Sequence, residues 1–234
     1  MGSNDGELAR VREICVKPSH HWSCPDFAEE KPQRQVEVGG FWMDRDEVTN
    51  RHFEDFVTAT GHQTDAEKRG EAQNWRTLYT SDKRDHPVVV VSWNDANAYC
   101  QWLGKRLPTE AEWEKAARGT EGYLWPWGDF WDAARVNSTE SGINGTYAVG
   151  ARGGELGQSP HGVNDMAGNV WEWTADWWGW YENPHRPPES NQEGWGKVIR
   201  GGSWRKQGYE TRTTFRGRAD PSGYSDDMGF RCAK

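Results

Sequence analysis

Apolar residues recur at helical spacing in three stretches of the chain, at intervals of three to four positions. The first stretch begins at Thr49, whose side chain suits an N-cap, and ends at Gly61, a typical stop residue. Phe53, Phe56 and Val57 form its apolar face. We therefore predict a helix of about three turns that packs on the core through these side chains.

Two further helices are predicted downstream. The second is expected to begin after Asn94 as its N-cap and to end at Gly104. Its inward face is predicted to consist of Ala98, Trp102 and Leu103. The third has the clearest signal, because Thr109 and Glu112 have the spacing of a capping box, in which each side chain binds the other residue's amide. Its buried face and its stop are predicted to be Trp113, Ala116, Ala117 and Gly119.

Strand patterns are short and scattered. Residues 35–38 alternate between polar and apolar, as half-buried strands do. Residues 88–92, four valines followed by Ser92, are predicted to form a short buried strand. Residues 197–204 read as a strand that enters a double-glycine turn, and residues 213–216 as another strand. Residues 62–85 are polar and are expected to form a long surface connection.

The sequence NDMAGNVWEW, which begins at residue 164, combines a tight turn with oxygen donors and indoles. Asp165 and Glu172 supply carboxylates, and Gly168 permits a sharp backbone turn. Carboxylates and carbonyls from one short segment are what Ca²⁺ prefers. Taken by itself, the stretch reads equally as a turn followed by a strand in which Trp171 and Trp173 alternate.

Composition favours one irregular domain with an aromatic core. Hydrophobic residues make up only 34%, yet 16 of the 234 residues are Trp and 27 are Gly. Because disordered chains lack aromatic residues, the chain is expected to fold. The sequence contains no linker that would separate two independent cores. We therefore predict a single domain over residues 35–234, with residues 1–34 as an N-terminal extension packed on it. A monomer is expected.

Charge and hydropathy exclude two classes of partner. A net charge of −8 disfavours binding to the phosphates of nucleic acid. No apolar run approaches the roughly 20 residues that span a bilayer, so no membrane partner is expected. No secretion signal is apparent, and the compartment stays open between cytoplasm and export with the leader absent.

Four cysteines allow two disulfides in three connectivities: Cys15, Cys24, Cys100 and Cys232. There is no CxxC motif, so a zinc ribbon or thioredoxin-like site is not indicated. Near the N-terminus, a loop closed by Cys15 and Cys24 is favoured over a metal site with His20 and His21, whose spacing fits no common ligand pattern. Four free thiols are the alternative.

Four motifs in order point to a family. They are DHPVVVVSWNDANAYCQWLGKRLPTEAEWEKAARG (85–119), NDMAGNVWEWTADWW (164–178), VIRGGSW (198–204) and GFRC (229–232). In these the chain resembles the formylglycine-generating enzyme (sulfatase-modifying factor) superfamily. The resemblance implies an α+β, loop-rich fold related to C-type lectins, with little regular secondary structure. It says less about activity, because function depends on sites carried by the fold.

The resemblance also implies cation sites and a cysteine pair. One calcium site maps to the side chains of Asp165 and Glu172 and the carbonyls of Gly168 and Val170. The second calcium site of the family has a serine here in place of an aspartate, which weakens a site for a hard cation. That set is Asn137, Ser138, Ser141 and Ile143. Cys100 and Cys232 resemble the family's core cysteine pair.

The family's catalytic thiols have no counterpart in this sequence. In formylglycine-generating enzymes, two cysteines follow the GGS turn in a pattern like GGSYxCxxxxC and bind copper(I), a metal that favours thiolates. Lys206 and Thr211 stand at those positions, although Ser203 and Trp171 match pocket residues. We therefore expect no copper and no formylglycine generation.

Three hypotheses about function follow. The first is a binding or accessory module for a peptide, protein, sugar or other small molecule, with an aromatic groove formed by Trp177, Trp178, Trp180, Tyr181, Trp195 and Trp204. The candidate pocket residues are Trp171, Trp178, Ser203, Trp204, Lys206, Glu210, Thr211 and Arg216.

The second hypothesis is an enzyme of different chemistry, possible because Lys206, Glu210, Arg216 and Asp220 offer acid, base and anion-binding groups. The third is a variable protein of a diversity-generating retroelement. Adenine-directed mutation of Asn codons that end in a pyrimidine cannot produce Lys206, Gln207 or Glu210, which weighs against it.

Overall fold

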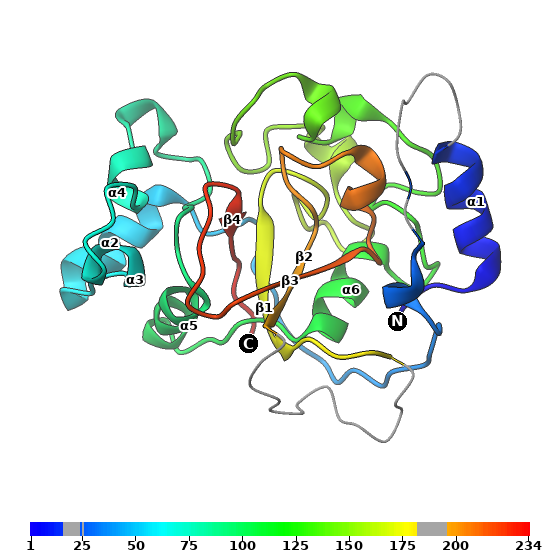
Figure 1. Cartoon of the computed structure of the whole chain (residues 1–234), viewed down its shortest axis with the longest axis horizontal. Helices are drawn as coiled ribbons and strands as arrows, with labels where there is room; N and C mark the ends of the chain where they lie inside the picture. Colours follow the sequence, from blue (N-terminus) through cyan, green and yellow to red (C-terminus); the bar gives the residue numbers. More distant parts are fainter. Residues whose placement is uncertain (16–23, 25, 182–195) are drawn as a thin grey trace.

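A computed structural model describes residues 1–15, 24, 26–181 and 196–234. A four-stranded sheet lies at the centre, in the order β3-β2-β1-β4 (Figure 1). Its strands are β1 (Trp171–Trp177), β2 (Lys197–Arg200), β3 (Arg216–Ala219) and β4 (Met228–Gly229). β2 is antiparallel to both β1 and β3, whereas β4 is parallel to β1. None of the helices in the described part is long and apolar enough to cross a membrane.

Helices surround the sheet, and much of the remaining chain is loop. The α-helices are α1 (Asp5–Cys15), α2 (Asn50–Thr60), α3 (Asp65–Lys68), α4 (Trp75–Leu78), α5 (Trp93–Trp102) and α6 (Glu110–Arg118). Short 3-10 turns are η1 (Ala28–Glu30), η2 (Ser81–Lys83), η3 (Ala133–Arg135), η4 (Thr139–Ser141), η5 (Gly154–Gly157) and η6 (Gly208–Thr211). α6 packs on β1 and β2, while α2 and α5 pack on each other (Figure 1). The prediction of a loop-rich α+β fold is confirmed.

Two helices follow their local signals. The Thr49 hydroxyl caps α2 by accepting from the His52 amide, and Gly61 ends it in the left-handed conformation (φ 70°). In α6, Thr109 and Glu112 form the predicted capping box, and Gly119 is the C-cap. The predicted inward faces of both helices are buried.

The N-cap of α5 lies two residues before the predicted one, and the helix begins at Trp93. Ser92, not Asn94, is the N-cap, because its hydroxyl and the Asp95 carboxylate form a capping box. The shift changes which side chains face inward. Trp102 and Leu103, predicted to be buried, are each 42% exposed. Ala98 is half-buried, and the buried positions are Asp95, Ala96, Tyr99 and Cys100.

Several other local predictions are wrong. Residues 35–38 form no strand, and residues 88–92 are buried but pair with different segments, since the Val88 amide donates to Val48 and the Val90 amide to Ser225. A strand starts at Arg216, at the end of the predicted range 213–216.

Helices also form in two stretches where none was predicted. The surface connection 62–85 contains α3 and α4, and Trp75 in α4 packs edge-on against Phe53 at 5.2 Å between ring centroids. In the N-terminal extension, for which no helix was predicted, α1 ends at Cys15.

Buried ion pairs join the N-terminal segment to the rest of the chain. Arg212 donates to both carboxylate oxygens of Glu30, at 2.6 and 2.9 Å. Arg118 donates to Glu7 at 2.8 Å. Because all four side chains are almost fully buried, each charge depends on its partner. Glu7 and Glu30 of the N-terminal segment are therefore part of the buried interior.

Asp176 in β1 provides a pH-dependent contact with α6. Its Oδ2 accepts the backbone N–H of Glu110, the first residue of that helix, at 2.5 Å. Burial, with the nearby Glu110 charge, raises the pKa of Asp176 to about 7 from a normal value of 3.8. Between these pH values the folded state retains a proton that the unfolded state has lost.

We expect the contribution of Asp176 to stability to be present below pH 4 and to be lost as the pH rises towards 7. Asp176→Asn should therefore flatten the pH dependence by up to a few kcal/mol between about pH 4 and pH 7. Urea unfolding of both proteins at several pH values checks this. Parallel curves for the variant and the parent protein would contradict it.

Candidate functional site

The GGS turn brings two distant motifs together. Gly201 and Gly202 have φ of 92° and 70°, and a Cβ on Gly202 would lie 2.7 Å from the Glu210 carbonyl oxygen, so glycine is required there. The Gly201 carbonyl accepts the Gly168 amide at 2.8 Å, and the Trp204 amide donates to the Asn169 carbonyl at 2.9 Å. The turn after β2 therefore lies directly against the NDMAGNVWE turn.

Lys206 and Thr211 carry no thiol and are both engaged within the protein. Lys206 Nζ lies 3.5 Å from Glu210 Oε1 and 5.9 Å from the centre of the Trp171 ring. Thr211 is fully buried, and its hydroxyl donates to the Gly208 carbonyl at 2.8 Å. An ammonium and a buried hydroxyl provide no soft ligand for a metal.

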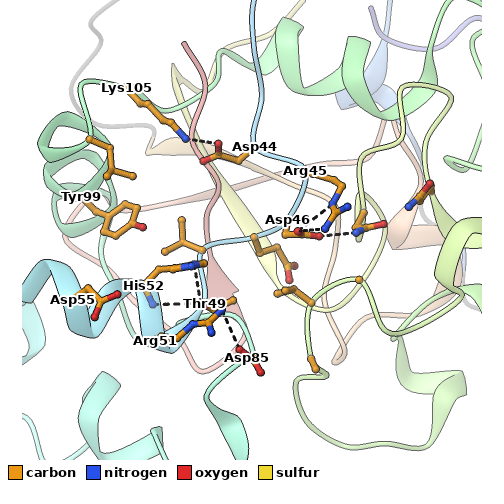
Figure 2. A pocket seen from close by; sticks show the side chains of 18 of the residues that line it. Asp44, Arg45, Asp46, Thr49, Arg51, His52, Asp55, Asp85, Tyr99 and Lys105 are labelled. Carbon is orange, nitrogen blue, oxygen red and sulfur yellow. Dashed lines mark hydrogen bonds and ion pairs between the residues drawn. The ribbon is translucent and has the colours of Figure 1, made fainter.

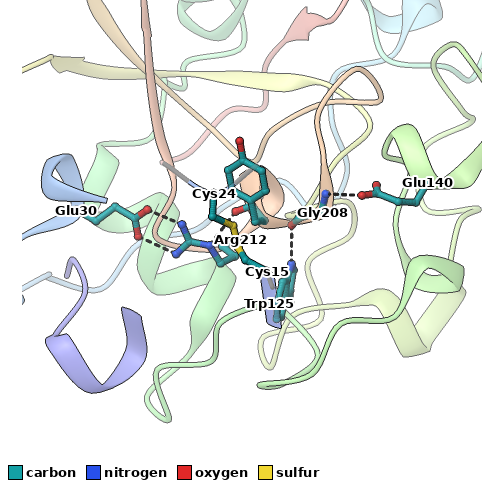
Figure 3. Close-up of a disulfide and its surroundings, with 8 residues drawn as sticks. Cys15, Cys24, Glu30, Trp125, Glu140, Gly208 and Arg212 are labelled. Atoms are coloured by element: carbon teal, nitrogen blue, oxygen red, sulfur yellow. Dashed lines mark hydrogen bonds and ion pairs between the residues drawn. A yellow bond between two sulfur atoms is a disulfide. The ribbon is translucent and has the colours of Figure 1, made fainter. Parts of the chain in front are cut away.

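All four cysteines of the chain are in disulfides. Cys15 is joined to Cys24 and Cys100 to Cys232, the same pairs that the sequence suggested. The Cys15–Cys24 bridge lies close to Gly208 and Arg212, in the segment that follows the GGS turn (Figure 3). No cysteine is left to act as a free thiol in this structure.

The candidate pocket residues divide into two groups by exposure. Trp204, Lys206 and Glu210 are partly exposed. The other five are buried: Trp171, Trp178, Ser203, Thr211 and Arg216. The buried group therefore shapes the fold in this conformation, and only the first group is accessible to a ligand.

Two of the buried residues have clear structural partners. The Ser203 hydroxyl donates to Asp227 at 2.7 Å. Arg216 donates to both oxygens of Glu110, at 2.6 and 3.0 Å, and its guanidinium lies 3.9 Å from the centre of the Tyr181 ring. Trp178 belongs to the same cluster, 5.4 Å from the Arg216 guanidinium.

The aromatic groove is not formed as predicted. Trp178 and Tyr181 are only 3% and 2% exposed, so they cannot line an open surface. Trp180 is exposed. The Lys197 ammonium lies 4.2 Å from the centre of the Trp177 ring. Trp195 lies outside the described residues.

The first predicted calcium loop adopts a tight turn, with φ of 55° at Asp165 and 75° at Gly168, and it continues into β1 just after Val170. Glu172 is fully buried, and Arg231 donates to both of its oxygens, at 2.6 and 2.7 Å. Trp113 Nε1 donates to the same carboxylate at 2.8 Å. Glu172 therefore does not fit as a cation ligand, because a guanidinium already neutralises it.

Asp165 and Glu47 form no ion pair with a described residue. Asp165 Oδ2 accepts the Gly150 amide at 2.6 Å, and burial raises the pKa of Asp165 to about 6. Glu47 is 2% exposed; one oxygen accepts from Asn169 at 2.6 Å, and the other, Oε1, is buried with no partner in the described part of the chain. Burial, with the Asp165 charge next, raises the pKa of Glu47. The local surplus of negative charge would be relieved by a cation.

In the second predicted calcium site, the Ser141 side chain fills the position of the cation ligand. Its hydroxyl lies 2.9 Å from Asn137 Oδ1 and 2.7 Å from the Ser138 carbonyl oxygen, and it accepts the Ile143 amide at 3.3 Å. The Ser141 hydroxyl thus contacts the Asn137 and Ser138 oxygens that would otherwise face a cation. These residues do not fit calcium.

Replacing Ser141 with aspartate is expected to open this second site. A carboxylate would repel the Asn137 and Ser138 oxygens unless a cation lay between them. In EDTA, Ser141→Asp should therefore melt at a lower temperature than the parent protein, and in millimolar calcium it should gain more stability than the parent does. Ser141→Ala should gain no more from calcium than the parent. A Ser141→Asp protein that gains no more from calcium than the parent would contradict this.

Comparison with known proteins assigns the chain to a family. The model of the "Sulfatase-modifying factor enzyme 1-like domain" family matches residues 8–234. The chain belongs to this family. The resemblance found in the four sequence motifs is thereby confirmed.

Both active and inactive members are among its relatives. The chain is 35% identical over 258 residues to the formylglycine-generating enzyme of Mus musculus, covering 87% of this chain and 68% of that protein. It is 34% identical over 254 residues to the inactive C-alpha-formylglycine-generating enzyme 2 of the same organism, covering 87% and 78%. Overall identity therefore does not separate the two kinds of relative.

Solved structures share the fold of this sulfatase-modifying factor family member. PvdO from Pseudomonas aeruginosa superimposes with a TM-score of 0.72 at 27% identity, over 89% of this chain and 88% of that one. The variable-protein hypothesis and the hypothesis of a different enzymatic chemistry stay predictions.

Sequence reasoning missed two residues of the site. Glu47 precedes the α2 cap, and no local pattern distinguishes it from a surface carboxylate. Arg231 did carry a signal, since a lone cation between Phe230 and Cys232 in an apolar segment predicts a buried ion pair.

Proposed function

We propose that this family member binds a ligand and does not convert cysteine to formylglycine. The observation that carries the proposal is that all four cysteines are held in disulfides, away from the two positions where the family's catalytic thiols are expected. Without a thiolate pair the GGS turn lacks ligands for copper(I), and oxygen activation by that route has no metal to start from.

The contacts of Lys206 and Thr211 support this. An ammonium beside Trp171 adds positive charge where copper(I) would have to bind, and such charge opposes a cation. Thr211 is fully buried against Gly208, so reaching a substrate would require the η6 segment to open. The existence of an inactive relative at 34% identity is consistent with a family member of this kind.

The test is an assay of formylglycine formation. The chain is incubated with copper(I), oxygen and a cysteine-containing sulfatase-motif peptide, and the peptide mass is followed, with the mouse formylglycine-generating enzyme as the positive control. We expect no aldehyde product. Oxygen-dependent conversion of the peptide would refute the proposal.

We also propose that one calcium ion binds beside Asp165 with Glu47 as a further carboxylate ligand, and not through Glu172. The buried, unpartnered Glu47 Oε1 supports this assignment. Calcium at a hundredfold excess over its dissociation constant should stabilise the protein by about 2.7 kcal/mol. Glu47→Gln and Asp165→Asn should abolish that gain in a thermal melt.

Glu67→Gln is the matched control for the calcium test, because Glu67 is a capping carboxylate in α3 that lies outside the proposed site. It should leave the response to calcium unchanged. Identical melting curves of the parent protein in calcium and in EDTA would refute the site.

A further inference from the structure

A cavity of about 1120 Å³ opens beside the start of α2 (Figure 2). We call it the acidic cavity. It lies between residues 44–55, the end of α5 and residues 148–158. Its carboxylates are Asp44, Asp46, Glu47, Asp55, Asp85 and Glu155, and its cationic side chains are Arg45, Arg51 and Lys105. Glu47 is left out of the charge balance, because it is assigned above to calcium. With His52 neutral, the other five carboxylates face three positive groups.

The three cations are each already paired with a carboxylate of the cavity. Lys105 pairs with Asp44. Arg45 lies 3.1 Å from Asp46, and Arg51 lies 3.4 Å from Asp85. The remaining carboxylates have no cationic partner within the described residues. The surplus charge of the acidic cavity therefore attracts a positively charged ligand.

Asp55 and Tyr99 define a position for such a ligand. Tyr99 is 4% exposed, and its ring packs on Phe53 and Phe56 with centroid distances of 5.9 and 5.5 Å. Its hydroxyl, which makes no hydrogen bond with any described residue, points into the acidic cavity (Figure 2). Asp55, exposed on α2, lies on the same side of the cavity (Figure 2).

The chemistry of the walls selects an organic cation over a metal ion. Trp102 and Leu103 line the acidic cavity and are each 42% exposed, which is unusual for such large apolar side chains. A metal ion gains nothing from an apolar wall, whereas an ammonium or guanidinium on an aliphatic body contacts both the carboxylates and the wall. An indole also attracts a cation through its ring face.

We propose that the acidic cavity binds an organic cation, a primary ammonium or guanidinium on an apolar body, with Asp55 and the Tyr99 hydroxyl as its polar partners. The inference rests on the proposed binding function and names the ligand class. Lysine or arginine side chains of a peptide and free polyamines share this chemistry. The site is formed by α2 and α5, not by the GGS turn.

Calorimetric titration at low salt distinguishes a free polyamine from a basic peptide as the source of the cation. One probe is spermidine, and the other is an acetylated, amidated peptide of alternating leucine and lysine. We expect at least one to bind, and its affinity to fall as salt is added. A peptide with glutamate in place of lysine should not bind. Equal binding of the glutamate peptide, or no binding of either cationic probe, would overturn the inference.

Substitutions locate the site. Asp55→Asn should weaken binding about tenfold and Tyr99→Phe about threefold, the sizes expected for loss of a charged and a neutral hydrogen bond. Tyr99→Phe retains the ring, so its fold is preserved. Glu71→Gln, an equal change of charge at an exposed position outside the acidic cavity, should have no effect. Binding that neither Asp55→Asn nor Tyr99→Phe alters would refute the location.

The two proposals fail separately. Absence of binding with a negative formylglycine assay would overturn the acidic-cavity inference and leave the loss of formylglycine generation standing. Formylglycine formation would overturn the proposed function whatever the titrations show.

Discussion

Arg231→Met is expected to cost about 3–5 kcal/mol of stability, one of the largest effects of any single substitution in this chain. Both Arg231 and Glu172 are fully buried, so removing the guanidinium leaves a carboxylate in the core without a counter-charge. Burying an unpaired charge is far more costly than losing a hydrogen bond. Glu172 would have to take up a proton or draw in water.

The position of the pair in the fold enlarges this effect. Glu172 lies in β1, the strand between β2 and β4, and it also accepts from Trp113 of α6. Arg231 donates to the carbonyls of Arg45 and Asn164, at 2.9 and 2.8 Å. One guanidinium thus joins the C-terminal segment, the central strand and the loops before α2 and β1.

Urea unfolding measures the cost. Arg205→Met is the matched control, because Arg205 pairs with Asp226 at the surface, and it should change the stability by less than about 1 kcal/mol. The double variant Glu172→Gln/Arg231→Met should recover part of the loss, since no charge is left buried. If Arg231→Met cost no more than Arg205→Met, this account of the pair would be wrong.

The sequence predicted the elements whose signals are local. α6 could be placed to the residue because its cap, its apolar face and its stop lie within eleven residues. The predicted N-cap of α5 was wrong because Ser92 and Asn94 are both good cap residues. The carboxylate of Asp95, which forms a capping box with Ser92, decides between them. Residues 88–92, with their four valines, were predicted as a strand because apolar content does not reveal with which segments a backbone pairs.

In the candidate site, too, local motifs could be read from the sequence, whereas contacts between distant segments could not. The sequence motifs identified the GGS turn and the NDMAGNVWE turn, but the hydrogen bonds that join the two turns became known only from the fold. The guanidinium that neutralises Glu172 comes from 59 residues away. Likewise, the acidic cavity combines α2 with α5 and the 148–158 loop, and it becomes visible only once the chain is folded. Contacts between distant segments leave little trace in a single sequence.

Removal of the Cys100–Cys232 disulfide is the second change expected to have a large effect. The bridge closes a separation of 132 residues and joins α5 to the C-terminal segment, with both cysteines fully buried. In the chain-entropy model, a loop of this length is worth about 5 kcal/mol. Cys15–Cys24 closes a separation of only 9 residues, for which the same model gives about 2.5 kcal/mol.

The two bridges can be compared within one protein. Cys100→Ala/Cys232→Ala should therefore destabilise the chain more than Cys15→Ala/Cys24→Ala, in urea unfolding without reductant. Cavity formation adds to the difference, because Cys100 and Cys232 pack in the aromatic core with Phe53 and Phe230. With reductant present, the parent protein should approach the stability of the variant that lacks both bridges. The reverse order of the two double variants would show that strain or residual structure in the unfolded chain outweighs loop length.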